Sequence, residues 1–249
     1  CHLNFAVKGV NQTADGVEVL AWENGQERLL EGSYLIASDG ADSTVRKACA
    51  IPFEGFTYPE KFLCLSTLYP IQDHLPGLAW VNYVADPQEW QVLLKTPTVW
   101  RVLVPALESE DDGDLTSVEK KNAVFDSLMG DGRVIETDHR TIYRVHQRVA
   151  KTWTHGRIML AGDAAHLNNP LGGLGMNSGI HDVWNLTDKL GAIYREGADP
   201  ERSLARYERQ RKTVCQEFVQ AQTIRNKAAM EDKSPDAQAR HQAKLEGIA

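Results

Sequence analysis

The sequence has no long hydrophobic run, no basic block and no signal peptide. Its longest continuous apolar stretches, residues 34–37 and 158–161, are far shorter than the roughly 18–20 residues that cross a bilayer. The amino terminus lacks a basic start followed by an apolar core. The net charge is −7, and Lys and Arg are not clustered as nucleic-acid binding requires. We therefore expect a soluble, cytoplasmic protein with no transmembrane segment and no nucleic-acid partner.

Paired cysteines and the usual hydrolase and metal motifs are also missing. Cys1, Cys49, Cys64 and Cys215 are far apart and form no CxxC pair, so we expect buried free thiols. No spacing of His, Cys and Asp indicates a metal site. No serine lies in the Gly-x-Ser-x-Gly context of a hydrolase nucleophile.

What is present is the composition of an ordinary globular protein, with 42% apolar and 24% charged residues among 249. Residues 34–37 and 158–161 are continuous apolar runs, which predict strands over 34–37 and 157–161 that are buried on both faces of a parallel sheet. Residues 4–38 alternate in the manner of strands, and the segments 5–10 and 17–22 predict an antiparallel meander before a polar stretch around Asn24 and Gly25. Periodic apolar residues predict helices over 117–129, 176–195 and 200–227.

Between the two buried strands lies a segment rich in aromatic, proline and β-branched residues, which predicts several strands joined by turns. The sequence thus predicts an α/β domain interrupted by a β-rich domain. Residues 1–50 and 151–249 would share the first domain, and residues 51–150 would form the second.

The first motif with chemical content is Tyr34–Arg46. It places Asp39 and Gly40 directly after a buried strand, at the sheet edge where open α/β folds bind ligands. Ser43 can cap a short helix, and we expect Arg46, one turn further on, to have its charge free for an anion. Taken alone, an Asp-Gly pair after a strand is equally an ordinary turn.

The second motif runs from Arg157 to Leu190. A strand delivers Gly162 and Asp163, and a glycine-rich loop then opens directly into a helix. Glycines let a loop lie against a flat ligand, and the amide groups at a helix amino terminus favour negative charge. The alternative is a glycine-rich helix entry with a solvated Asp163.

Together, in this order and about 120 residues apart, the two motifs resemble those of the class A flavoprotein monooxygenases, the para-hydroxybenzoate hydroxylase-like family. The resemblance covers most of residues 30–230 and is strongest over 157–190. It implies an FAD-binding Rossmann-like domain of the glutathione-reductase type, interrupted by a β-rich substrate domain.

The resemblance also implies roles for individual residues. Asp39 and Arg46 match positions that serve the FAD pyrophosphate and the nicotinamide cofactor, and Gly162 and Asp163 match those that bind the FAD ribityl and ribose portion. The loop along the isoalloxazine ring and the helix start at the flavin pyrimidine edge are matched by Pro170, Gly172, Gly173, Leu174, Gly175, Met176 and Asn177.

Two departures from the family pattern stand out. Many members have Pro-Pro where this chain has Asn169-Pro170, the residues we assign to substrate contact. The Gly-x-Gly-x-x-Gly fingerprint is absent, and the chain does not begin with Met. We therefore expect a βαβ unit carrying that fingerprint to lie upstream, and the chain alone to bind FAD poorly.

The activity implied by the resemblance is hydroxylation of a small phenol with FAD, NAD(P)H and O2, through a flavin C4a-hydroperoxide. No catalytic acid or base is assigned, and we expect His166 to pack in the loop rather than act as a base. The alternatives are an epoxidase, halogenase or reductase of the same fold, or an inactive FAD-binding remnant. The substrate, the choice between NADH and NADPH, and a homodimer through the carboxyl-terminal helices are left open.

Overall fold

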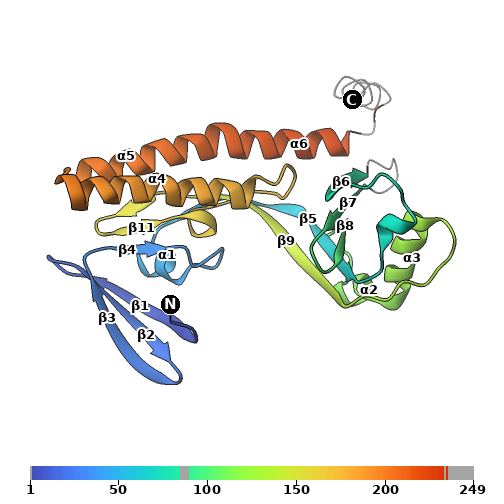
Figure 1. Ribbon diagram of the computed structural model, residues 1–249, viewed down its shortest axis with the longest axis horizontal. Coiled ribbons are helices and arrows are strands. Elements are labelled where there is room, and N and C mark those ends of the chain that lie inside the picture. Colours follow the sequence, from blue (N-terminus) through green and yellow to red (C-terminus); the bar gives the residue numbers. More distant parts are fainter. Residues whose placement is uncertain (1, 85–89, 233, 235–249) are drawn as a thin grey trace. The chain divides into compact units, whose positions relative to one another are not determined.

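The structure is a computed structural model that describes residues 2–84, 90–232 and 234 (Figure 1). Beyond Glu231 the structure describes only Asp232 and Ser234. The chain divides into two compact units. Unit 1 holds residues 2–56 and His146–Lys227, and unit 2 holds Thr57–Val145 with the described residues from Ala228 onward. The assignment of a cofactor-binding and a substrate-binding role to these units stays a prediction.

Unit 1 contains the two strands predicted from their apolar runs, but only the second is buried throughout. Ile36 in the first strand is 41% exposed, so that strand is not covered on both faces as predicted. Strand β4 (Leu35–Ala37) pairs in parallel with β11 (Ile158–Leu160), and β10 (Thr154–His155) lies antiparallel on the other side of β11. A second sheet is the antiparallel meander predicted for the start of the chain. Its strands are β1 (Phe5–Gln12), β2 (Val17–Glu23) and β3 (Gln26–Gly32).

The helices of unit 1 are α1 (Thr44–Ala48), α4 (Leu174–Glu196), α5 (Pro200–Val214), a π-helical segment (Cys215–Gln220) and most of α6 (Ala221–Glu231). Helices α4 and α5 lie on one side of strands β4 and β11, and α1 lies on the other (Figure 1). Asp199 caps α5 through the Arg202 amide, and Pro200 occupies the first turn, where its missing N–H costs nothing. The core includes Trp153, Met159, Leu186 and Tyr207, all fully buried.

Unit 2 is built on the β-rich segment. The six-stranded sheet has the order β12-β9-β5-β8-β7-β6, and β5 and β9 have residues in both units. Its strands are β5 (Phe53–Thr67), β6 (Val81–Val84), β7 (Gln91–Lys95), β8 (Trp100–Leu107), β9 (His139–Ala150) and β12 (His166–Leu167). Helix α3 (Val118–Met129) contributes Val124 and Phe125 to a separate core with Leu63, Leu65 and Val102.

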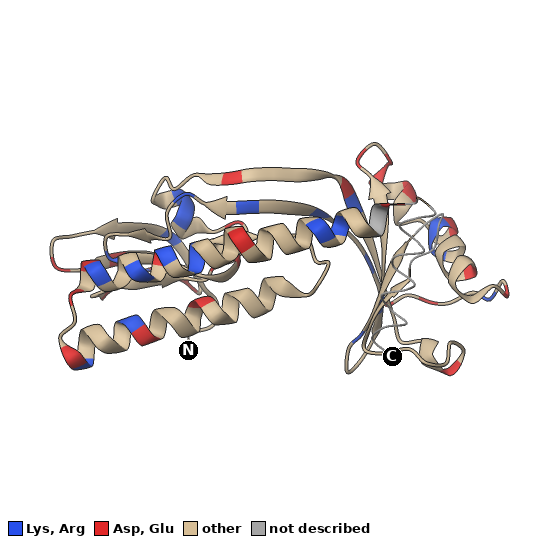
Figure 2. Ribbon diagram, turned by 90° about the horizontal axis from the view of Figure 1, so that it is seen from above, with Lys and Arg blue, Asp and Glu red and all other residues tan. Residues whose placement is uncertain are grey.

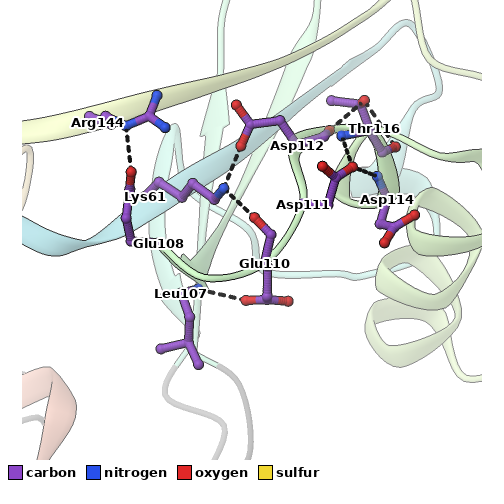
Figure 3. Close-up of polar contacts among 10 residues, drawn as sticks. Lys61, Leu107, Glu108, Glu110, Asp111, Asp112, Asp114, Thr116 and Arg144 are labelled. Carbon is purple, nitrogen blue, oxygen red and sulfur yellow. Dashed lines mark hydrogen bonds and ion pairs between the residues drawn. The ribbon is translucent and has the colours of Figure 1, made fainter.

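A buried lysine holds an acidic loop in unit 2 (Figure 3). The Lys61 side chain is 2% exposed and donates to the Glu110 carbonyl at 2.5 Å and to the Asp112 carboxylate. Asp111 caps the short helix α2 (Asp112–Leu115), and Arg144 on β9 pairs with Glu108 at 3.0 Å. The loop that follows β8 is therefore tied to the sheet by two cations.

Within the part of the chain that the structure describes, every helix is too short or too polar to cross a membrane.

Candidate cofactor site

The two motifs meet at one edge of the parallel sheet in unit 1. Because β4 and β11 are parallel neighbours, Asp39 and Asp163 follow the same ends of adjacent strands. The Ala161 amide continues the ladder by donating to the Ala37 carbonyl at 2.9 Å. Both carboxylates are exposed. The structure thus brings the acidic residues of both motifs to the edge where the sequence predicted them.

Glycines allow the strand end and helix α4 to approach closely. Gly162 has φ +61°, in the left-handed region that disfavours side chains. A Cβ on Gly179 would lie 3.1 Å from the Gly162 Cα, closer than side chains normally approach. The turn that carries Asp163 therefore rests on the first half of α4.

The amino terminus of α4 is open to an anion. Its N-cap is Gly173 at φ +64°, no side chain caps it, and its first turn has no acidic residue. Its first charged residue is Asp182, so the helix is uncharged over its opening turns (Figure 2). Uncapped amide groups and the helix dipole favour negative charge at such an end.

A cavity of about 470 Å³ lies beside these groups in unit 1. Its size falls within the range of small-molecule sites. One wall is Ser38, Gly162 and Asp163, and the other is the exposed side of α4, where Trp184 is 78% exposed. The remaining lining residues are Gly175, Met176, Gly179, Ile180, Val183 and Thr187.

Arg46 does not have a free charge, so this expectation was wrong. The residue is 5% exposed, and its guanidinium donates to the carbonyls of Ala164 at 2.9 Å and Ala41 at 2.8 Å. It also lies 3.8 Å from the centroid of the Phe53 ring. A buried guanidinium needs acceptors, and nearby backbone carbonyls supply them. Arg46 therefore joins the first motif to the turn of the second.

The side chain of Asn169 is also not available to a substrate. Asn169 is 1% exposed. Its side-chain nitrogen Nδ2 donates to the Thr223 carbonyl at 3.0 Å, and its side-chain oxygen Oδ1 accepts from the Leu171 backbone amide at 3.1 Å. Asn226 donates to the Leu171 carbonyl at 3.1 Å. The buried side chain of Asn169 cannot contact a substrate, and contact through its backbone or through the exposed Pro170 stays a prediction.

In the rest of the loop and helix start, Gly175 and Met176 line the cavity, and Gly172, Gly173 and Asn177 are exposed. Gly172 has φ +107°, and a Cβ there would lie 2.7 Å from the Asn226 amide nitrogen, so only glycine fits. Met176 is exposed, and the Asn177 side chain donates to the Gly173 carbonyl at 2.9 Å. Leu174 and Gly175 are partly buried in the first turn of α4.

A buried ionic network that was not predicted from the sequence lies under the turn. Asp182 accepts from Arg211 Nε at 2.8 Å, from the Gly162 amide at 3.1 Å, and contacts His166 Nε2 at 2.9 Å. Burial of the His166 ring lowers its pKa, but Asp182 and the neighbouring Cys215 outweigh this and raise the pKa to about 9. His166 is packed in the loop as expected.

Helical spacing could have revealed this network. Ser178, Asp182 and Leu186 are four residues apart and share the buried face of α4. A charged residue on that face needs a buried partner. Arg211 occupies the corresponding buried face of α5, with Leu204 and Tyr207.

Comparison with known proteins decides the family. A model described as an FAD binding domain matches residues 2–222. The chain belongs to this FAD-binding family. It is 32% identical over 248 residues to para-nitrophenol 4-monooxygenase of Pseudomonas sp. (strain WBC-3), covering 96% of this chain and 60% of that protein. It is 29% identical to pentachlorophenol 4-monooxygenase of Sphingobium chlorophenolicum, covering 85% of this chain and 39% of that protein.

Solved structures share the fold. The crystal structure of p-nitrophenol 4-monooxygenase PnpA from Pseudomonas putida DLL-E4 matches with a TM-score of 0.87 and 31% identity, covering 97% of this chain and 61% of that one. The Diels-Alderase PyrE3 matches with a TM-score of 0.76 and 26% identity, covering 98% of this chain and 52% of that one. The chain thus spans about 60% or less of the length of these relatives.

The residues of this FAD-binding chain fit the cofactor. The exposed carboxylate of Asp163 can accept hydrogen bonds from sugar hydroxyls. A Cβ on Gly173 would meet no atom within 4 Å, so there is open space beside the loop, and the uncapped start of α4 suits the electron-rich edge of a flavin.

Proposed function

We propose that this chain is the part of an FAD-dependent monooxygenase that hydroxylates a small phenol with NAD(P)H and O2. The observation that carries the proposal is 32% identity across 96% of the chain to a para-nitrophenol monooxygenase. The cavity geometry supports it, because the exposed Asp163 and the open start of α4 adjoin the same space.

In this proposal the chain orients the cofactor and supplies no acid or base. FAD, when bound, supplies the redox chemistry that uses NAD(P)H and O2. Asp163 would hold its sugar hydroxyls, Asp39 would serve its pyrophosphate region, and the loop from Pro170 to Gly175 would line its ring. The backbone amides of Met176 and Asn177 donate to its pyrimidine edge. Pro170 and groups from the β-rich unit contact the substrate.

The test is consumption of NADH and of NADPH by the purified, FAD-loaded protein with a panel of phenols that includes para-nitrophenol. We expect consumption to rise on addition of a phenol, with a hydroxylated product detected by mass spectrometry. Consumption that ignores every phenol would contradict the proposal.

A second candidate is a reaction other than hydroxylation on the same fold. The match to the Diels-Alderase PyrE3 supports this second candidate. That protein shares the fold at 26% identity but is named for an activity other than hydroxylation. FAD binding without phenol-dependent NAD(P)H consumption would point to this candidate.

We also propose a cytoplasmic location and a homodimer that forms through the carboxyl-terminal helices. Size-exclusion chromatography with light scattering tests the homodimer by measuring the molar mass in solution.

A further inference from the structure

The turn that carries Asp163 is anchored on both sides of that residue. The Gly162 amide donates to Asp182 Oδ2 at 3.1 Å, and His166 Nε2 lies 2.9 Å from the same oxygen. The Ala164 carbonyl accepts from Arg46 Nη1 at 2.9 Å. Asp163 itself is exposed and lines the cavity. The surrounding side chains therefore hold the turn and leave its carboxylate to face a ligand.

Asp182, which accepts from the Gly162 amide and contacts His166, is itself held in place. Asp182 is fully buried, and its second oxygen accepts from Arg211 Nε at 2.8 Å. Arg211 also donates to the Ser178 carbonyl at 3.3 Å, and the Trp153 ring stacks on His166 with centroids 5.3 Å apart. Charge-assisted hydrogen bonds are strong where water does not replace them, so this buried network restricts the movement of the side chains in it.

We propose that Asp182 and Arg46 are positioning residues that preorganise the Asp163 carboxylate for the sugar hydroxyls of FAD. A turn already held in its binding geometry loses less conformational entropy when the ligand arrives. The inference rests on the proposed function, because it takes FAD as the ligand of Asp163. It gives Arg46 a task other than direct contact with an anion.

A purely structural role for Asp182 makes a different prediction. If the network only stabilises the core, its loss lowers FAD affinity whether or not Asp163 is present. If Asp182 acts through Asp163, the two losses are not additive. A double-mutant cycle separates the two roles.

The experiment is titration with FAD, followed by flavin fluorescence, of the apo form of the whole enzyme that contains this chain, because the chain alone is expected to bind FAD poorly. The proteins compared are wild type, Asp163→Asn, Asp182→Asn and the double variant. We expect Asp163→Asn to weaken binding about 10–100-fold, the effect of losing hydrogen bonds to a charged acceptor. Asp182→Asn should weaken it roughly 3–10-fold, and should add less than about twofold in the Asp163→Asn background. Asp188→Asn is the charge-matched control on α4, because Asp188 is exposed and pairs with Lys189.

Arg46 is tested in the same way. Arg46→Lys keeps the charge but cannot serve both the Ala164 and Ala41 carbonyls with a planar group. We expect it to weaken FAD binding by a similar roughly 3–10-fold, again only when Asp163 is present. Arg157→Lys is the control, since Arg157 donates to the Ser33 and Ala14 carbonyls away from the turn.

Reduced stability is controlled with Leu186→Ala, which removes a buried side chain four residues from Asp182 on the same helix face. Visible circular dichroism of the bound flavin should change in Asp182→Asn and Arg46→Lys and remain that of wild type in Leu186→Ala. Additive losses, or equal losses in Leu186→Ala, would overturn the positioning role. Absence of FAD binding by the wild type, or no effect of Asp163→Asn, would instead overturn the proposed function on which the role rests.

Discussion

At the scale of single residues, His166 links stability to pH. Its folded pKa of about 9 lies above its ordinary value of 6.5, because Asp182 and Cys215 outweigh the effect of burial. A raised pKa contributes stability that is fully present below about pH 6.5 and lost as pH rises through about 9. The protonated ring, Asp182 and Arg211 together form the buried network.

We expect the free energy of unfolding to fall by roughly 2–4 kcal/mol between pH 6.5 and 9.5, and His166→Gln to remove most of this slope. Urea unfolding at a series of pH values measures it. His155→Gln is the control, because His155 is exposed in the same unit. An unchanged slope in His166→Gln would rule out this residue as the source.

At the scale of elements, helix α4 depends on a glycine where it crosses the turn after β11. A Cβ added to Gly179 would lie 3.1 Å from the Gly162 Cα, whereas a Cβ added to Gly191, further along, would meet the flexible end of Arg195 at 4.0 Å. Ala is favoured over Gly inside a helix, so the two sites should respond in opposite ways.

Gly191→Ala should stabilise the protein by about 0.5–1 kcal/mol without changing FAD affinity. Gly179→Ala should lose that gain and weaken FAD binding, because the added methyl displaces the turn that carries Asp163. Thermal unfolding and FAD titration of the pair measure this. Equal changes in stability and FAD affinity for Gly179→Ala and Gly191→Ala would show that the close approach of Gly179 to Gly162 has no consequence.

In unit 2, Lys61 is the residue on which the loop after β8 depends (Figure 3). Lys61→Ala should destabilise the protein by about 2–4 kcal/mol, because it removes buried packing and leaves the Glu110 carbonyl without its donor. Lys61→Met keeps most of the volume and should cost less. Urea unfolding compares the two, and equal costs would mean that packing contributes nothing.

At the scale of the whole molecule, the buried residues form separate clusters in the two units, around Trp153 and around Phe125. Phe125→Ala should cost about 3–5 kcal/mol in unit 2. Hydrogen exchange followed by mass spectrometry should then rise in β8 and α3 while β11 and α4 stay protected. A uniform rise would show that the two units unfold as one.

Local patterns predicted much of this molecule. The apolar runs before Asp39 and Gly162 indicated the strands of the parallel pair β4 and β11. Strand β11 is buried throughout as predicted, whereas Ile36 on β4 is 41% exposed. The spacing of glycines and the following periodicity placed the start of α4 to within two residues. The same motifs indicated the family that the match over residues 2–222 establishes.

Partners of buried polar groups could not be predicted in this way. Whether Arg46 faces an anion or the Ala164 carbonyl, 118 residues away, depends on which segments the fold brings together. The same holds for Asp182 with His166 and Arg211, and for Asn169 with Thr223. The sequence by itself determined the strands, the helices and the two motifs, because these follow from local spacing and polarity. Only the tertiary structure decided which charges are buried and which face the cavity, because burial depends on contacts between distant segments.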